Sequence, residues 1–361
     1  MKLIAEELWF QRDLIDLEER RFILRFKSVS KSWNALFQNP NFISKHFKNQ
    51  STIPDPSFLF TPTYSPSTSD GKVGFIFSDS SDKSIKIPIE IDFPILKPFS
   101  VCGSCNGLIC LSVLPIGAII FLWNPATRVC KDLPISPIDR PPRAVPIKVV
   151  IGFGFDDVVK DYKVLRIMYD RYSVDQVEIY SLSTNSWREI KTRVPFLISA
   201  CSVFLNGKLH WNASGFQEMN GKKLIATFDF REEAFNYIMP PKFDLSRRIN
   251  GKIDSCSVVM MKESLAMIGS VRIGSRKMFE VWVMKEYGAV SSWMKYRSFE
   301  LKPKVGKWLG CGLKGEFMFE KDDNELVEKD DNQLVVYDLD SHSQSVINLG
   351  NQEVAYCCPK D

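Results

Sequence analysis

The chain has 361 residues, of which 45% are hydrophobic and 25% charged, and its formal net charge is +4. This composition is that of a globular protein and excludes a disordered or fibrous chain. The small charge and the lack of a dense Lys/Arg run argue against nucleic-acid binding. Glu6, Glu7 and Arg12 interrupt the apolar run that a signal peptide would need at the start of the chain. The most apolar stretch, 116–123, is much shorter than the roughly 20 residues of a membrane helix. We therefore expect a cytoplasmic or nuclear protein with no signal peptide and no membrane span.

Residues 1–47 contain no Gly, and their only Pro is Pro40. Large apolar residues recur three and four positions apart, which is the spacing of one helix face. They are Phe26, Val29, Trp33 and Leu36. Pro40 then stops the pattern, because Pro cannot continue a helix. We predict a small helical segment over 1–47.

Residues 48–72 are rich in Ser, Thr and Pro, which predicts a linker or entry loop. Residues 73–357 read as short strands separated by turns. The predicted strands include Val73–Phe77, Ile85–Ile91, Leu108–Val113, Ile119–Trp123, Val149–Phe153, Lys163–Met168, Gln176–Leu182 and Phe279–Met284. Asn106-Gly107 and Asn206-Gly207 lie between apolar runs, and Asn-Gly is the strongest short-range hairpin signal.

The strand pattern also repeats. In each copy an aromatic residue ends an apolar run and precedes a polar turn. The aromatic residues are Phe77, Trp123, Tyr180, Phe228, Trp282 and Tyr337, spaced by about 52 residues on average. A kelch blade of four strands has about 50 residues, so the fold class is mainly β, with a propeller-like domain of about six blades. Two stacked sheets without a repeat are the alternative.

A short duplication lies near the end of the chain. Residues 320–327 and 328–335 are alike at seven of eight positions. We expect the first copy to form a solvated loop, since loops absorb insertions at low entropic cost. Calcium binding is the alternative, because Asp and Asn crowd here, but the turn Gly of an EF-hand loop is missing.

Metal and redox chemistry have little support. The nine cysteines are scattered, and we expect mostly buried thiols. Cys102 and Cys105 have redox-motif spacing, but they precede an Asn-Gly turn instead of opening a helix. The three histidines form no pair with metal-ligand spacing. We predict no metal and no cofactor.

No catalytic set stands out either. The run from Gly152 to Asp156 lacks the third Gly of a dinucleotide-binding loop, and strand follows it, so a turn of the β domain is favoured. Asp156, Asp157 and Asp161 are expected to cap a turn instead of acting as acid and base. His210 is expected on a strand, in the core or at an edge.

Four tryptophans are expected to pack between blades: Trp123, Trp187, Trp211 and Trp282. An aromatic ligand pocket is the alternative for them. The loops expected to carry binding specificity are Pro134–Pro146, Phe216–Lys223, Lys242–Gly251 and Lys302–Lys307.

The N-terminal segment resembles the second half of a plant F-box, through Leu24-Arg-Phe26-Lys-Ser-Val29-Ser-Lys-Ser-Trp33 and Asn39-Pro40-Asn41-Phe42. The resemblance implies that a stripe of apolar side chains meets a Skp-type adaptor. By resemblance these adaptor-binding residues are Leu8, Leu24, Phe26, Val29, Trp33 and Leu36. The first half departs from the family, because Ile4-Ala5 replaces Leu-Pro and the charged stretch 11–21 is longer than usual.

The β region resembles the F-box-associated interaction (kelch-like) domain of plant proteins over roughly 98–350. The landmarks are Ser104-Cys-Asn-Gly-Leu108, Leu122-Trp-Asn-Pro-Ala-Thr127, Gly152-Phe-Gly-Phe-Asp156, Asp161-Tyr-Lys-Val164, Val177-Glu-Ile-Tyr180, Asn206-Gly-Lys-Leu-His-Trp211 and Phe279-Glu-Val-Trp282. S-locus F-box proteins share these landmarks, and so do many relatives without their role.

Together the two resemblances imply a non-catalytic substrate receptor of an SCF-type ubiquitin ligase. The F-box would bind the adaptor and through it a cullin, and the propeller loops would bind a target protein of unknown identity. One alternative is a propeller binding module whose degenerate F-box no longer recruits the ligase. Another is a propeller enzyme, which the few histidines disfavour.

Overall fold

The computed structural model describes a large part of the chain. The described residues are 30–32, 57–61, 74–78, 85–86, 99–113, 119–124, 129–138, 148–170, 174–199, 203–216, 219–244, 253–273, 276–301, 305–311, 315–321, 333–348 and 356–359. The predicted helical segment over 1–47 therefore lies outside the described residues, apart from 30–32. Within the described residues, no helix has both the length and the apolar character needed to cross a membrane.

The described strands form six antiparallel sheets, which we name A to F in the order in which they follow along the chain. Sheet A pairs β25 (Tyr356–Pro359), β1 (Ser57–Thr61), β2 (Gly74–Ser78) and β3 (Ile85–Lys86). Sheet B contains β4 (Phe99–Cys105), β5 (Leu108–Val113), β6 (Ile119–Asn124) and β7 (Val129–Asp132). Sheet C contains β8 (Lys148–Asp156), β9 (Asp161–Tyr169), β10 (Val174–Ser181) and β11 (Ser186–Glu189).

The remaining three sheets follow in the same way. Sheet D contains β12 (Phe196–Ile198), β13 (Val203–Leu205), β14 (Lys208–Gly215), β15 (Lys223–Asp229) and β16 (Ala234–Ile238). Sheet E contains β17 (Ile253–Met261), β18 (Ser264–Ile273), β19 (Arg276–Met284) and β20 (Trp293–Glu300), with the short 3-10 helix η2 (Val290–Ser292) before β20. Sheet F contains β21 (Val305–Cys311), β22 (Glu316–Lys321), β23 (Gln333–Asp338) and β24 (Gln344–Asn348).

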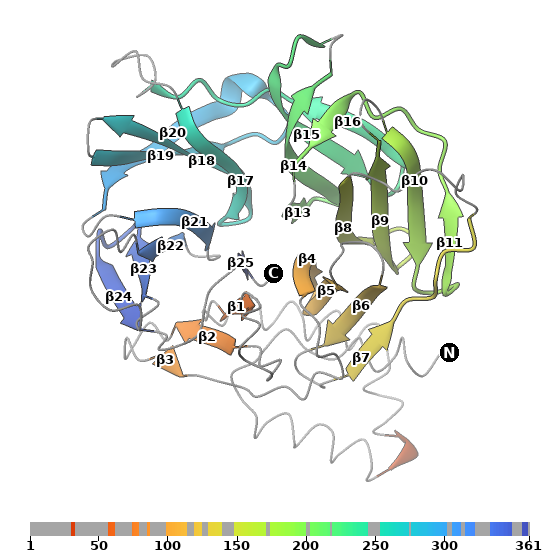
Figure 1. Cartoon of the computed structure of the whole chain (residues 1–361). Coiled ribbons are helices and arrows are strands. Elements are labelled where there is room, and N and C mark those ends of the chain that lie inside the picture. Colours follow the sequence, from red (N-terminus) through yellow and green to blue (C-terminus); the bar gives the residue numbers. More distant parts are fainter. Residues whose placement is uncertain are drawn as a thin grey trace.

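The sheets stand around a common axis like the blades of a propeller (Figure 1). The first strand of each sheet lies nearest the axis, and contacts join β4 to β8, β13 to β17, β17 to β21, and β25 to both β21 and β4. In sheet D, β12 and β13 share the place of the first strand, because both pair with β14. The mainly β, propeller-like fold expected from the repeat is therefore confirmed, and a pair of stacked sheets is not what forms.

Sheet A joins the two ends of the described propeller. The last strand, β25, pairs antiparallel with β1, so that Leu59 lies opposite Cys358. The sequence analysis expected about six blades; five of the six sheets come from continuous stretches of chain, and sheet A comes from both ends. The strand β1 lies within residues 48–72, which were assigned to a linker, so this stretch supplies one strand of sheet A.

The repeated aromatic residues occupy one structural position. Phe77, Trp123, Tyr180, Phe228, Trp282 and Tyr337 all lie on the third strand of their sheet. The predicted strands are present as well: Leu108–Val113 agrees residue for residue with β5. Of the predicted strand Ile85–Ile91, the structure describes only the two residues of β3. Both Asn-Gly pairs form hairpin turns with positive φ, as the sequence predicts.

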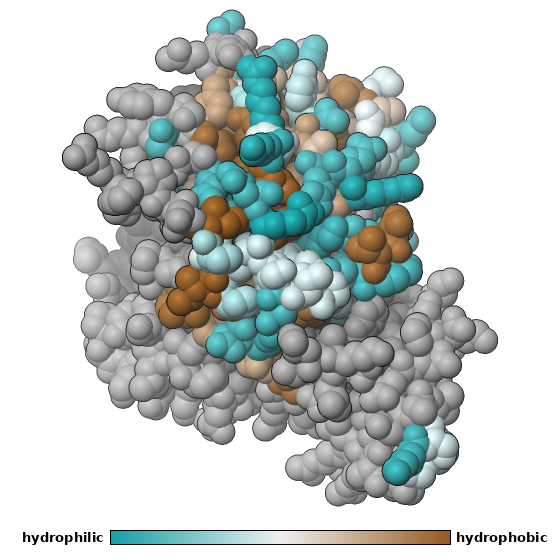
Figure 2. All heavy atoms as spheres, turned by 90° about the vertical axis from the view of Figure 1, so that its right-hand side faces the viewer, coloured by the Kyte–Doolittle hydropathy of each residue, from teal (hydrophilic) through white to brown (hydrophobic). Residues whose placement is uncertain are grey.

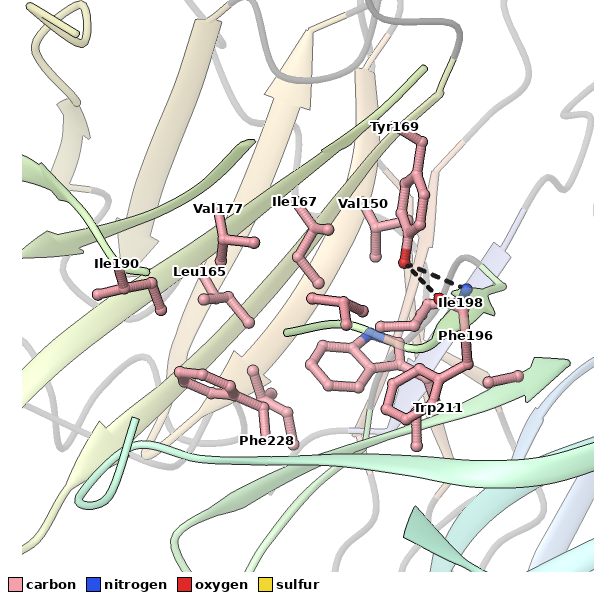
Figure 3. Close-up of a cluster of buried hydrophobic side chains, with 14 of the residues drawn as sticks. Val150, Leu165, Ile167, Tyr169, Val177, Ile190, Phe196, Ile198, Trp211 and Phe228 are labelled. Atoms are coloured by element: carbon pink, nitrogen blue, oxygen red, sulfur yellow. Dashed lines mark hydrogen bonds between the residues drawn. The ribbon is translucent and has the colours of Figure 1, made fainter. Parts of the chain in front are cut away.

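The second strands of sheets B and C are buried on both faces, because each of these sheets is packed between two neighbours. All nine residues of β9 are buried, and so are all six of β5. The core is therefore divided into layers between sheets, of which the layer between sheets C and D is drawn in Figure 3. There Trp211 is fully buried, and the hydroxyl of Tyr169 donates to the carbonyl oxygen of Phe196 at 3.2 Å and accepts from the N–H of Ile198 at 3.3 Å.

Three of the four tryptophans expected between blades contribute to such layers. Trp187 lies in the layer between sheets B and C, Trp211 in that between C and D, and Trp282 packs against the layer between D and E. The fourth, Trp123, is buried, with 1% of its surface exposed.

The two glycines that begin the Gly152–Asp156 run are explained by this packing. A Cβ at Gly152 would lie 2.5 Å from a side-chain carbon of Leu209, and one at Gly154 would lie 2.4 Å from the ring of Phe204. Both contacts are shorter than van der Waals distance, so sheet D can approach β8 only where the side chain is absent. The run is thus the end of strand β8, whereas the sequence analysis favoured a turn; the turn itself follows Asp156.

Candidate functional site

The two faces of the propeller differ because antiparallel strands send alternate connections to opposite ends of a sheet. One face carries the connections from first to second strand and from third to fourth strand; we call it the turn face. The other carries the connections from second to third strand and from one sheet to the next; we call it the loop face. Each face is a candidate binding surface.

Short, capped turns build the turn face. The carboxylate of Asp229, at the end of β15, accepts from the N–H groups of the second and third residues after it at 2.8 and 3.2 Å. Asp338, at the end of β23, does the same at 2.8 and 2.9 Å. These Asx turns explain why Asp follows the repeated aromatic residue in sheets D and F. Asp156 caps the turn between β8 and β9 in the same way, as predicted for it.

Turns of neighbouring sheets are also joined on this face. The ammonium of Lys163 in sheet C lies 2.7 Å from Asp156 Oδ2 and donates to the carbonyl oxygen of Phe230 in sheet D at 3.3 Å. Burial of Asp156 opposes its ionisation, but the hydrogen bonds from Lys163 and from the backbone outweigh this and lower its pKa. Between sheets E and F, Lys262 pairs with Asp340 at 2.7 Å, and Tyr296 donates to the same carboxylate.

A buried histidine makes a similar link between sheets D and E. His210 on β14 has no exposed surface, and its Nε2 lies 2.8 Å from the hydroxyl of Tyr287. Its Nδ1 lies 3.2 Å from the carbonyl oxygen of Val203, which can only accept, so Nδ1 carries the proton and Nε2 accepts from Tyr287. Burial lowers the pKa of His210 to about 4, so the ring is neutral at pH 7. The predicted core histidine is confirmed.

Sheet C also contains a buried ion pair, which joins two of its strands. Arg166 on β9 donates from Nε to Oε2 of Glu178 on β10 at 2.9 Å, and its guanidinium lies 4.5 Å from the ring centre of Trp187. Glu178 is fully buried, and its Oε1 has no hydrogen-bond partner among the described residues. Sequence reasoning missed this pair; its only signal was the presence of two charged residues inside apolar strands.

The described cysteines are thiols, and four of them are buried: Cys102, Cys105, Cys110 and Cys311. The hydrogen bond with Cys110 and burial raise the pKa of Cys102, so it is a poor nucleophile at neutral pH. In the part of the chain that the structure describes, no three His, Cys, Asp or Glu side chains come together as a possible metal site.

The loop face carries the long connections. All four segments that were expected to carry specificity belong to it, because each joins second to third strands or one sheet to the next. Their described parts are 134–138, 216, 219–223, 242–244 and 305–307, the last of which begins β21. Ile135 has 89% of its surface exposed. The duplication over 320–335 joins β22 to β23 on the same face, with 322–332 outside the described residues.

Two loop-face segments are brought together around sheet D. The crossing from sheet C to sheet D, residues 190–195, touches the turn between β14 and β15, since the N–H of Phe216 donates to the carbonyl oxygen of Pro195 at 3.1 Å. Figure 2 shows the side of the propeller formed by sheets B to D, where hydrophilic side chains dominate and hydrophobic ones form small, separate patches. This outer side of the propeller is therefore largely polar.

The adaptor-binding residues inferred by resemblance lie outside the described residues. They are Leu8, Leu24, Phe26, Val29, Trp33 and Leu36. Their side chains remain assigned by the sequence alone.

Comparison with known proteins identifies the β region. Residues 66–358 match the F-box associated beta propeller domain. The F-box protein At3g07870 of Arabidopsis thaliana is 28% identical over 320 residues, which cover 81% of this chain and 70% of the relative. The F-box protein CPR1 of the same plant is 26% identical over 366 residues, covering 92% and 82%. The F-box/kelch-repeat protein At3g23880 is 27% identical over 290 residues, covering 76% and 74%.

The family match spans most of the chain and agrees with the propeller that the strands build. The chain belongs to the family of proteins with an F-box associated beta propeller domain.

Proposed function

We propose that this protein is the substrate-recognition subunit of an SCF-type ubiquitin ligase, acting in the cytoplasm or nucleus. The observation that carries the proposal is the order of two features: the F-box-like motif from Leu24 to Trp33, followed by a propeller of the F-box associated family. The relatives above are named F-box proteins, which supports the same assignment.

The two parts would have separate tasks. The N-terminal segment would hold a Skp-type adaptor and through it a cullin, with Phe26, Val29 and Trp33 among its apolar anchors. The loop face would hold the target protein. The receptor would perform no chemistry itself and would raise the effective concentration of the target near the ubiquitin-conjugating enzyme.

Co-elution with the adaptor tests the proposal directly. The full chain and a plant Skp-type adaptor are mixed and separated by size-exclusion chromatography. We expect a complex that Trp33→Ala abolishes. Truncating a large apolar anchor at the centre of an interface typically lowers the binding free energy by about 2 kcal/mol or more. Lys31→Ala is the matched control, because Lys31 is exposed and should leave the complex intact.

A second candidate function is a propeller binding module that does not recruit the ligase. The observation that favours it is the divergent first half of the F-box, where Ile4-Ala5 stands in place of Leu-Pro. Under this alternative the intact chain would not co-elute with any Skp-type adaptor. A complex that survives Trp33→Ala would instead show that other residues hold the adaptor.

Affinity purification from plant tissue with the proteasome blocked extends the test to the target. We expect adaptor, cullin and a ubiquitinated protein to be recovered together. Recovery of the ubiquitinated protein should depend on the propeller, and recovery of the adaptor and cullin should depend on Trp33.

A further inference from the structure

Two buried cysteines of sheet B lie side by side. Cys102 on β4 and Cys110 on β5 belong to the same core layer, with 8% and 0% of their surfaces exposed. A hydrogen bond joins their thiols. Cys102 Sγ donates its only proton to the carbonyl oxygen of Ser100 at 3.7 Å, so it accepts the proton that Cys110 donates. The two sulfur atoms are therefore direct neighbours.

A β-bulge produces this contact. Val101 lies opposite Leu111 and Gly103 lies opposite Cys110, so Cys102 is the extra residue of β4. Two consecutive residues, Cys102 and Gly103, thus face a single residue of β5. In a regular strand, alternation would direct the side chain of Cys102 to the other face of the sheet. Because Gly103 has no side chain, Cys102 supplies the thiol opposite Cys110.

The backbone geometry suits a disulfide between these two residues. Opposed residues of antiparallel strands have Cα atoms about 4.5–5.5 Å apart, which is inside the range of about 4.4–6.8 Å found in disulfides. Cys105, which has redox-motif spacing from Cys102 in the sequence, lies three residues along the same strand. That separation is roughly 8–10 Å, too long for a disulfide. The structure therefore favours a pair across two strands over the pair within β4.

We propose that Cys102 and Cys110 form an oxidation site, at which a hydroperoxide converts two thiols into a disulfide across the β4–β5 hairpin. The proposal goes beyond the proposed function and does not depend on it, because both cysteines lie in the propeller and the N-terminal segment takes no part. The disulfide would enclose the Asn106-Gly107 turn and fix the bulge.

The oxidation has two steps. Cys102 is the more exposed of the two residues, so its thiolate attacks one oxygen of hydrogen peroxide. The O–O bond breaks, a sulfenic acid forms, and hydroxide leaves. Cys110 then attacks the sulfenic sulfur, so that the S–S bond forms and the S–O bond breaks. The two cysteines lose two electrons, and their two protons end in the two water molecules to which the peroxide is reduced.

The surroundings make the two steps differ in rate. The hydrogen bond from Cys110 and burial raise the pKa of Cys102, so little thiolate is present and the attack on peroxide is slow. The second step is fast, because Cys110 is already in contact with the sulfur that it attacks. The pair should therefore pass directly to the disulfide without accumulating the sulfenic acid.

The test treats the purified full chain with hydrogen peroxide, alkylates it with N-ethylmaleimide in denaturant, and digests it with trypsin. One tryptic peptide, residues 87–128, contains Cys102, Cys105 and Cys110. We expect the maleimide groups on this peptide to fall from three to one, with fragmentation placing the remaining group on Cys105. Dithiothreitol added before alkylation should restore all three. Cys311, which is also buried, is the internal control and should keep its maleimide.

Two variants separate the pair across the strands from the pair within β4. Cys105→Ser should still form the disulfide, so that its peptide loses both maleimides. Cys110→Ser should form no disulfide within the peptide, as its mass reports. Circular dichroism melting checks that both variants are folded, and the assignment in the native chain does not depend on either of them.

Three results would overturn the proposal. The native peptide could keep all three maleimides at peroxide concentrations that already modify Cys311. The remaining maleimide could lie on Cys110, which would mean that Cys102 and Cys105 form the disulfide. Cys110→Ser could form a disulfide as readily as the native chain, which would mean that contact across the strands is not required.

Discussion

The turn face and the loop face are built from opposite ends of the same strands, yet they use charge in different ways. On the turn face Lys163, His210 and Lys262 each bond to a neighbouring sheet, at 3.3, 2.8 and 2.7 Å respectively. On the loop face Lys191 and Lys222 extend into solvent from longer connections. Sheets are also joined on the loop face, where Tyr169 bonds to Phe196 and Lys148 donates to the carbonyl oxygen of Ile198 at 2.6 Å, so the difference concerns the exposed side chains of the connections.

The largest expected effect on the turn face is the response of His210 to acid. Its pKa of about 4 lies below the ordinary 6.5, so the unfolded chain binds the proton more readily between these values. The stability that comes from burying the neutral ring is complete above pH 6.5 and is lost as the pH falls to about 4. The loss is about 3 kcal/mol at most. Urea unfolding at pH 7, 6, 5 and 4.5 measures it.

His210→Gln is the control for this prediction, because Gln does not titrate. Of the groups around the ring, Tyr287 has its pKa raised by burial to about 12 and stays neutral, and the neighbouring Lys208 helps to lower the pKa of His210. The variant should therefore lose less stability than the native chain between pH 6.5 and 4.5. Identical slopes in the two proteins would show that His210 is accessible to protons in the folded state.

The next effect concerns Lys163, which pairs with Asp156 within sheet C and donates to Phe230 of sheet D. Lys163→Met leaves the buried carboxylate of Asp156 without its ammonium partner, which we expect to cost about 2 kcal/mol in unfolding free energy. Adding Asp156→Asn removes the stranded charge and keeps a side-chain oxygen for the turn. The double variant should therefore be more stable than Lys163→Met alone, as measured by urea unfolding. The opposite order would mean that the ammonium of Lys163 does not stabilise the buried carboxylate of Asp156.

A smaller effect is expected from the turn caps. Asp338→Ala removes the acceptor for the N–H groups of Asp340 and Ser341, and should cost about 1 kcal/mol. Asp338→Asn keeps an oxygen in place and should recover about half of that loss, because Asn also forms Asx turns. Thermal melting of the three proteins gives the comparison. If Asn and Ala behave alike, the cap contributes charge instead of a hydrogen bond.

The smallest effect is expected on the loop face. Lys222→Ala removes an exposed side chain without an ion pair, and its change in unfolding free energy should lie within about 0.5 kcal/mol. Lys262→Ala, on the turn face, breaks an exposed pair and should cost about 0.5 kcal/mol or slightly more. A loss of more than about 1 kcal/mol of unfolding free energy in Lys222→Ala would show that this loop-face side chain does stabilise the fold, which contradicts the comparison between the faces.

Much of the fold could be predicted from residues close in sequence. The hairpins at Asn106-Gly107 and Asn206-Gly207 follow from the positive φ that these residues adopt readily. The repeat was visible because an aromatic third-strand residue precedes a turn cap, and both requirements are local. The sequences of the loops assigned to specificity do not indicate which face of the propeller they lie on. The pairing of the strands places all of them on the loop face.

The sequence by itself determined where most strands and turns lie, because alternation, turn residues and caps act over a few residues. The tertiary structure decided everything that depends on neighbouring sheets. It brought β25 beside β1, required Gly at position 152 against Leu209, and buried His210 against Tyr287. It also placed the connections that carry Lys191, Lys222 and Lys242 on one face. These contacts join residues distant in sequence, and only the closing of sheets around the axis makes them neighbours.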